Sequence, residues 1–148
     1  SGTITSNLII TATAATIKTF QVTITQSENQ TITVRVGSVD YTSTFTANYG
    51  MTYTVTVTPA NGYNAGTPSV SSGTITSNLI ITATAATIKQ YTVTLSQPAN
   101  GSIQAVHNGT TYTSGSFVVN HGDSVTFTCI PNSGYTLQTW TKNGQPIT

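Results

Sequence analysis

The chain has 148 residues and a formal net charge of +1, and only 5% of its residues are charged, against about a quarter in an ordinary soluble domain. Four Lys and Arg side chains are too few to neutralise a run of phosphates, which excludes nucleic-acid binding. The 34 threonines and the scarcity of Glu and Lys argue against a helical bundle, and the alternation of apolar residues argues against disorder.

No apolar run approaches the roughly 18 residues that a membrane-spanning helix needs. The longest aliphatic stretches are only Leu8–Ile10 and Leu79–Ile81. The single cysteine, Cys129, excludes an internal disulfide framework.

An exact repeat organises the chain, since the 18 residues Ser1–Lys18 recur without a change as Ser72–Lys89. Such identity indicates a slice of a tandem array. We therefore expect residues 1–18 to be the last segment of a preceding repeat, residues 19–89 to be a complete repeat, and residues 90–148 to be a repeat that lacks its last strand. The offset between the repeats grows by one residue further along, and we expect the insertion near Asn108-Gly109.

Within each repeat the apolar residues alternate with polar ones at a period of two, which predicts strands with one buried and one wet face. Threonine suits the wet face because it is β-branched. In chain order the predicted strands are residues 20–24, 32–36, 53–57, 78–85, 91–95 and 125–129. Turn signals of the Asn-Gly type lie between them. The predicted fold class is all-β, with tandem small β-sheet modules of about five or six strands, either sandwich or grasp-like, and no substantial helix.

The second repeat carries an ordered set of motifs: the strand Tyr91–Leu95, the turn Gly122-Asp123, an apolar strand, the corner Pro131–Tyr135 and then Trp140. This order resembles the divergent internalin-type B-repeat, a module of similar size that forms long arrays on bacterial surface and phage proteins. The last strand of that family resembles Asn78–Ala85 in this chain. The resemblance implies stalk or adhesin arrays and no catalysis.

The first repeat departs from the same pattern at two positions. Met51 stands where the Asp belongs, and Pro68 stands near the position of the Trp. The resemblance covers most of the chain. Its motifs are structural, and they indicate no ligand.

The residues with reactive side chains favour structural roles. His121-Gly122-Asp123 contains a histidine two residues from a carboxylate, but the first repeat shares only the glycine, as Gly50, which favours a tight turn. His107 falls at a strand end with too few ligands nearby for a metal ion, and Cys129 lies in the inward register of its strand. We therefore predict no catalytic residue, no metal site and no cofactor, and hence no enzyme.

Three aromatic residues, Tyr49, Tyr112 and Trp140, are candidates for a ligand platform. Exposed rings beside Asn and Thr side chains stack well on sugars. The competing interpretation, which we favour for Trp140, is packing inside a repeat or between repeats.

Two functions follow from these patterns. The first is a structural module of an extracellular stalk or filament, on a cell surface or a phage virion, whose partners are neighbouring repeats of the same protein. In a sharper version, residues 1–18 join further copies head to tail by strand complementation, with Leu8, Ile10, Ala12 and Ala14 as the inserted side chains. The alternative is that this segment belongs to a preceding repeat of one longer chain. The second function is an adhesin or carbohydrate-binding repeat for a host-surface glycan or protein.

Overall fold

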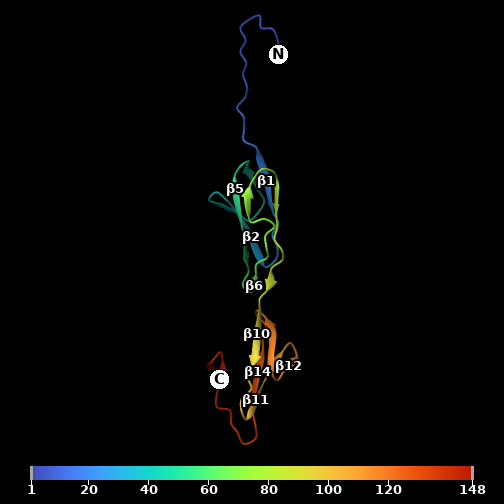
Figure 1. The fold of residues 1–148 in the computed structure, drawn as a ribbon, viewed down its shortest axis with the longest axis vertical. Helices are drawn as coiled ribbons and strands as arrows, with labels where there is room; N and C mark the ends of the chain where they lie inside the picture. The colour runs from blue at the N-terminus through green and yellow to red at the C-terminus, as the bar shows by residue number, and fades with distance from the viewer. Residues whose placement is uncertain (1, 148) are drawn as a thin grey trace. The chain divides into compact units, whose positions relative to one another are not determined.

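The computed structural model describes residues 2–147, and every regular element among them is a β-strand. This confirms the predicted all-β class and its small sheets. Contacts divide the chain into two compact units. Unit 1 holds the residues up to 27 together with 32–57 and 67–84, and unit 2 holds 28–31, 58–66 and the residues from 85 onwards. Figure 1 shows β1, β2 and β5 as the long strands of unit 1, and β10, β11 and β14 as those of unit 2.

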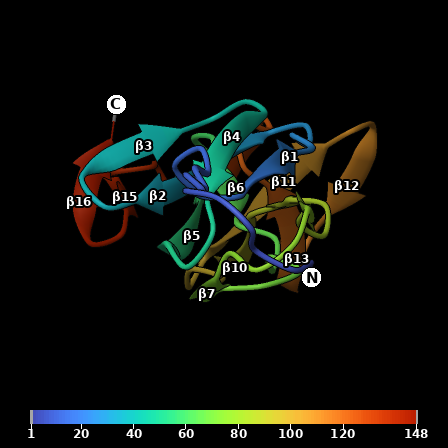
Figure 2. The same cartoon turned by 90° about the horizontal axis from the view of Figure 1, so that it is seen from above.

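The first repeat forms two sheets. One has the strand order β4-β1-β8 and the other has the order β3-β2-β5-β7. Their bounds are β1 Thr19–Ile24, β2 Gln30–Val36, β3 Val39–Tyr41, β4 Phe45–Asn48, β5 Thr52–Pro59, β7 Ser72–Thr74 and β8 Leu79–Ile81. Figure 2 shows β3 beside β2 and β4 beside β1, as the strand pairing requires.

The core of the first repeat lies between these sheets and follows the period-two pattern of the sequence. The buried residues Val22 and Ile24 of β1 share one core with Ile32, Val34 and Val36 of β2, while Thr23 and Thr33 between them are less buried. Alternation of this kind buries one face of a pleated strand and leaves the other face in water. The predicted strands around residues 20–24, 32–36 and 53–57 are therefore confirmed.

A closing segment, residues 67–84, completes the first repeat by lying across both sheets. Its strand β8 runs parallel to β1, in the register Val22↔Leu79 to Ile24↔Ile81. Its strand β7 runs antiparallel to β5. Ile81 is fully buried and Ile75, between the two strands, is 1% exposed. The closing segment therefore supplies two of the largest fully buried side chains of the repeat.

The second repeat reproduces five of these strands with the same pairing. Strand β10 pairs with β13, and β11 lies between β12 and β14. The bounds are β10 Gln90–Leu95, β11 Gly101–His107, β12 Thr110–Tyr112, β13 Gly115–Asn120 and β14 Thr126–Pro131. Its smaller core contains Leu95, Ala105, Phe117 and Val119.

The predicted position of the one-residue insertion is wrong. Both repeats have hairpin loops of two residues, 37–38 and 108–109, and the offset of 71 persists up to Tyr112. The offset is 72 only from Phe117, which pairs with Val93 as Phe45 pairs with Val22. The extra residue therefore lies between Tyr112 and Phe117, where Gly115 at the start of β13 has a φ of 73° that glycine adopts without strain.

A glutamine bridges two loops in each repeat, a feature that the sequence analysis missed. Gln26 donates from Nε2 to the carbonyls of Ile32 (2.7 Å) and Thr42 (2.8 Å), and its Oε1 accepts the N–H of Ile32 (2.7 Å). Gln97 makes the same three bonds in the second repeat, with Ile103 and Thr113.

The remaining strands are short. Strand β6, Tyr63–Asn64, pairs with β9, Thr87–Ile88, within unit 2. Strands β15, Trp140–Lys142, and β16, Gln145–Ile147, form a hairpin that Figure 2 shows beside the letter C. The predicted turn at Gly50 and Gly122 is confirmed, since both glycines have positive φ angles of 84° and 88°.

Candidate functional site

Residues 2–18 form neither helix nor strand and are exposed along their whole length. The same sequence is folded into the first repeat as residues 73–89, which gives a direct comparison of two environments. Ile10 is 83% exposed whereas its counterpart Ile81 is fully buried. Ile4 is 70% exposed whereas its counterpart Ile75 is 1% exposed. The same sequence is therefore partly buried in the first repeat and fully exposed at residues 2–18.

Unit 2 contains a groove of about 870 Å³ between β10 and β14. One wall is β10 with Val93 and Leu95, the other is β14 with Phe127 and Cys129, and Trp140 lines it as well. Beyond the pairing with β13, the described residues offer β10 no second strand partner. The groove therefore combines an apolar lining with a free strand edge.

This groove corresponds to the surface that the closing segment covers in the first repeat. β8 lies on the edge of β1, the counterpart of β10, and β7 lies on the edge of β5, the counterpart of β14. The burial of matched residues reflects the difference. Val22 is fully buried but Val93 is half-buried, and Tyr53 is buried but Val125 is half-buried. The second repeat has the same two walls, residues 136–143 also line the groove, and none of its described strands lies in the place of β8.

The counterparts of the predicted inserted side chains follow the expected alternation for three positions. Leu79, Ile81 and Ala83, which match Leu8, Ile10 and Ala12, are half-buried or buried. Ala85, the counterpart of Ala14, is exposed, so the inward face ends one position earlier than the sequence pattern indicates.

Asn78 has a role that its sequence position did not predict, because its side-chain oxygen accepts the backbone N–H of Gln21 at 2.9 Å. This bond fixes the start of the parallel pairing, and the N–H of Thr25 donates to the carbonyl of Ile81 at its end (2.9 Å). The one signal in the sequence was the exact repeat, which has an asparagine at the same place, Asn7.

The three predicted platform residues lie on different elements. Tyr49 follows β4, is exposed, and lies tilted against Phe20 with ring centroids 6.3 Å apart. Tyr112 ends β12 and stacks on Phe117 at 3.9 Å, which engages one of its faces in the core. Trp140 opens β15 and lines the groove. Of the three, Trp140 is the residue that the structure associates with a concave surface.

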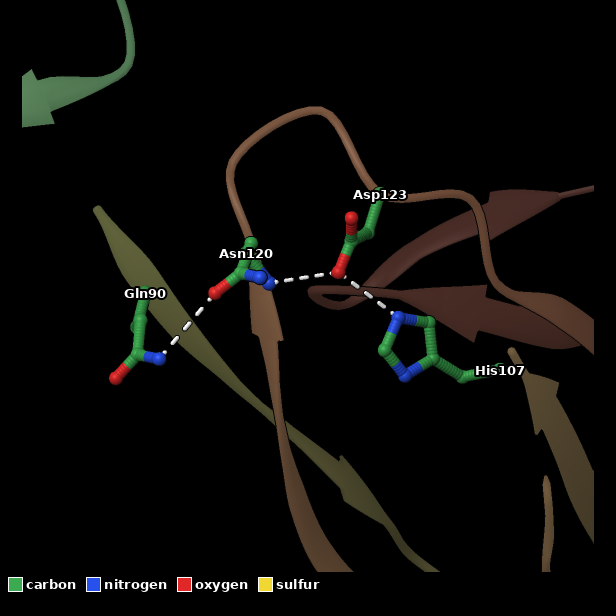
Figure 3. Close-up of polar contacts among 4 residues, drawn as sticks. All are labelled: Gln90, His107, Asn120 and Asp123. Atoms are coloured by element: carbon green, nitrogen blue, oxygen red, sulfur yellow. Dashed lines mark hydrogen bonds and ion pairs between the residues drawn. The ribbon is translucent and has the colours of Figure 1, made fainter. Parts of the chain in front are cut away.

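Asp123 pairs with His107, as Figure 3 shows, although His121 is the histidine closer to it in the sequence. The Nε2 atom of His107 lies 2.9 Å from Oδ2 of Asp123, and the same oxygen accepts the N–H of Asn120 at 2.9 Å. The side chain of Asn120 accepts a bond from Gln90 on β10. These bonds hold the turn after β13 against β11, so the cluster has a structural role.

The Asp123 carboxylate makes the second repeat sensitive to acid. The N–H of Asn120 and then the His107 ring lower its pKa below the usual 3.8. A carboxylate with a lowered folded-state pKa stabilises the fold above its unfolded-state pKa and loses this contribution as the pH falls through the folded-state value. We expect an Asp123→Asn variant to melt at a lower temperature than wild type at pH 7, and the difference to shrink as the pH falls below 3.8. Thermal unfolding followed by circular dichroism measures the difference in melting temperature, and a difference that grows as the pH falls would contradict the assignment.

Other chemistry is limited within residues 2–147. Their His, Cys, Asp and Glu side chains form no group of three or more that could hold a metal ion. In the same range, no helix has the length and apolar character needed to cross a membrane. Cys129 is a free, half-buried thiol on β14 that lines the groove.

The chain contains two similar sheet modules, and the segment that closes the first module occurs a second time in the sequence. These features define a tandem β-repeat protein. Residues 91–147 match the family model described as divergent InlB B-repeat domain. This match covers most of the second repeat and confirms the resemblance predicted from its motifs. The first repeat shares its strand order and pairing. No curated protein and no solved structure matches the chain.

Proposed function

We propose that the chain is a structural repeat module of an extracellular stalk or filament, carried on a bacterial surface or a phage virion. The B-repeat family of residues 91–147 and the exact repetition of 18 residues support this proposal. A surface with 5% charged residues offers few cleavage positions to trypsin-like proteases and few charges for salt to screen. The proposal assigns no catalytic activity to the chain.

The observation that carries the proposal is the closing segment. In the first repeat, the Leu79–Ile81 strand completes the sheet of one module, and the chain continues through β9 directly into β10 of the next module. Residues 1–18 have the same sequence and, in this proposal, perform the same closure for another repeat by strand complementation. In the first repeat the strand that closes one module thus runs on covalently into the next.

A stalk requires its joints to resist proteolysis, and the chain offers a matched pair of trypsin sites. Lys18 and Lys89 follow identical sequences, but residues 2–17 are unpaired whereas Lys89 follows β9. The carbonyls of both lysines are bonded alike, since Lys18 accepts the N–H of Tyr49 and Lys89 that of His121, both at 2.8 Å. The difference lies before the lysine, where the Lys89 N–H donates to Gly62 at 2.8 Å next to the β6–β9 pairing. We expect cleavage at Lys89 to be at least about tenfold slower than at Lys18, because a protease needs locally opened chain. Equal rates, measured by mass spectrometry, would contradict a protected joint.

A second candidate function is carbohydrate binding, favoured by the position of Trp140 in a groove that also contains Thr, Asn and Gln side chains. A glycan array tests it, with Trp140→Ala as the variant and Tyr49→Ala as the control outside the groove. Binding that Trp140→Ala abolishes and Tyr49→Ala preserves would favour the adhesin function over the stalk. Absence of any glycan binding by wild type would rule out this second candidate function.

A further inference from the structure

We propose that the groove between β10 and β14 binds the segment Asn7–Ala12 of a second copy of this chain, with Leu8–Ile10 added as a parallel strand to the free edge of β10. This inference rests on the proposed role of residues 1–18 as a closing strand. It adds the partner, the binding site and the register.

The register follows from the first repeat, where the identical sequence is already seated. Strand β8 pairs with β1 as Val22↔Leu79, Thr23↔Ile80 and Ile24↔Ile81. The counterparts of these residues in the second repeat and in the free segment give Val93↔Leu8, Thr94↔Ile9 and Leu95↔Ile10. Residues 93–95 all line the groove.

The polar contacts at both ends of the strand have counterparts as well. In the first repeat the Asn78 side chain accepts the N–H of Gln21, and the carbonyl of Ile81 accepts the N–H of Thr25. In the proposed complex Asn7 accepts the N–H of Thr92, and the carbonyl of Ile10 accepts the N–H of Ser96. Both of these donors belong to residues that line the groove.

The two faces of the inserted strand differ sharply. Ile81 is fully buried in the first repeat, but its neighbour Ile80 is 68% exposed. Since side chains alternate along a strand, Ile10 enters the groove of the second copy and Ile9 remains on its outer face. Both isoleucines are exposed in the free segment, so a change at either one leaves the folded repeats untouched.

The inserted segment and the groove are different parts of the chain, so the contact between two copies is heterologous. Head-to-tail binding of this kind generates an open fibre unless the rotation closes a ring. A free strand edge is the usual template for such an exchange. The partner is thus a copy of the chain itself, in an assembly that grows with concentration.

The test compares wild type, Ile10→Asp and Ile9→Asp as full 148-residue chains by light scattering over a range of concentrations. We expect wild type and Ile9→Asp to form oligomers that grow with concentration. Ile10→Asp should weaken this association by more than about 100-fold, because a carboxylate takes the place of a buried isoleucine. Monomers in all three proteins would overturn the inference, as would equal weakening by both substitutions.

Cys129 provides a second readout, since it is the single cysteine and lines the groove. Its reaction with a thiol reagent should slow by at least about tenfold at concentrations where wild type assembles, and should keep the dilute rate in Ile10→Asp. Assembly with an unprotected Cys129 would place the contact elsewhere, and protection that does not depend on concentration would show that the segment folds back within one chain. Both results would overturn the second-copy inference. The proposed stalk function has its own test in the Lys18 and Lys89 cleavage rates, so the two failures are distinguishable.

Discussion

Replacing Ile81 by alanine should destabilise the first repeat by about 3 kcal/mol, within the range of about 2–5 kcal/mol for Ile→Ala changes in cores. Ile81 is fully buried, and it packs in the cluster that contains Val22, Ile32 and Tyr53. The loss has two parts, the transfer free energy of the removed carbons and the cavity that they leave. For a repeat of this size, such a loss lowers the melting temperature by more than about 10 °C.

Ile80 is the matched control for this prediction. It is adjacent, chemically identical and 68% exposed, so Ile80→Ala should change the stability by less than about 0.5 kcal/mol. Calorimetry of the two variants beside wild type gives the comparison. Equal losses at the two positions would mean that the closing segment does not alternate as its pairing with β1 requires.

Replacing Gln26 by alanine should cost about 2–3 kcal/mol, the second large effect that we expect. The change removes three hydrogen bonds of 2.7–2.8 Å and leaves the backbone N–H and carbonyl of Ile32 without the partner that Gln26 supplies. A typical hydrogen bond contributes about 1 kcal/mol, and a buried group left unpaired costs more. Ile32 itself is fully buried, which makes water a poor substitute.

The same change at Gln97 gives a graded comparison. Its three bonds have the same geometry but lie in a more exposed loop, where water replaces the lost partner more readily. Gln97→Ala should therefore cost less than Gln26→Ala in chemical denaturation. In a further variant, Gln26→Glu, the acceptor oxygen remains and the Nε2 donor is lost, so an intermediate effect is expected. A Gln26→Ala variant as stable as wild type would contradict the proposed role of the bridge.

The sequence pattern predicted the strands because alternation is a local property. Val22, Ile24, Ile32 and Val34 alternate with polar residues, and a pleated strand with one buried face needs no distant information. The tandem organisation followed from the exact repeat alone. The family resemblance rested on an ordered set of turns and aromatic residues, and the match of residues 91–147 confirms it.

Long-range pairing was less accessible from the sequence. Leu79–Ile81 pairs in parallel with β1, which lies 57 residues earlier, and no local signal specifies that partner. The Asp123 carboxylate has a histidine two residues away in sequence, yet His107 is the one that reaches it, from an adjacent strand. Gln26 looked like one more polar loop residue, because its partners lie 6 and 16 residues further along the chain.

The surroundings of the aromatic residues were the least accessible from the sequence. Tyr49, Tyr112 and Trp140 were all candidate platforms, with packing favoured for Trp140, but stacking on Phe117 engages Tyr112, while Trp140 lines a groove. The burial of an aromatic side chain depends on which strands pack together. Composition alone therefore does not distinguish a buried aromatic residue from an exposed one. The groove could not be predicted either, because it depends on how the strands pair. Its relation to the closing segment follows from the comparison of that segment in the first repeat with the exposed residues 2–18.

The most direct test of the central claim, that the repeated segment is a closing strand, is residue-resolved amide exchange by NMR on the full chain. The segment occurs twice with one sequence, so differences in exchange report environment alone. In a parallel ladder alternate residues bond to the neighbouring strand, and Ile81 is one that bonds to β1. At low concentration we therefore expect slow exchange at Leu79 and Ile81 and fast exchange at Leu8 and Ile10. At high concentration Leu8 and Ile10 should become protected as well. Fast exchange at Leu79 and Ile81, or Leu8 and Ile10 still unprotected in assembled protein, would contradict this account of the repeat.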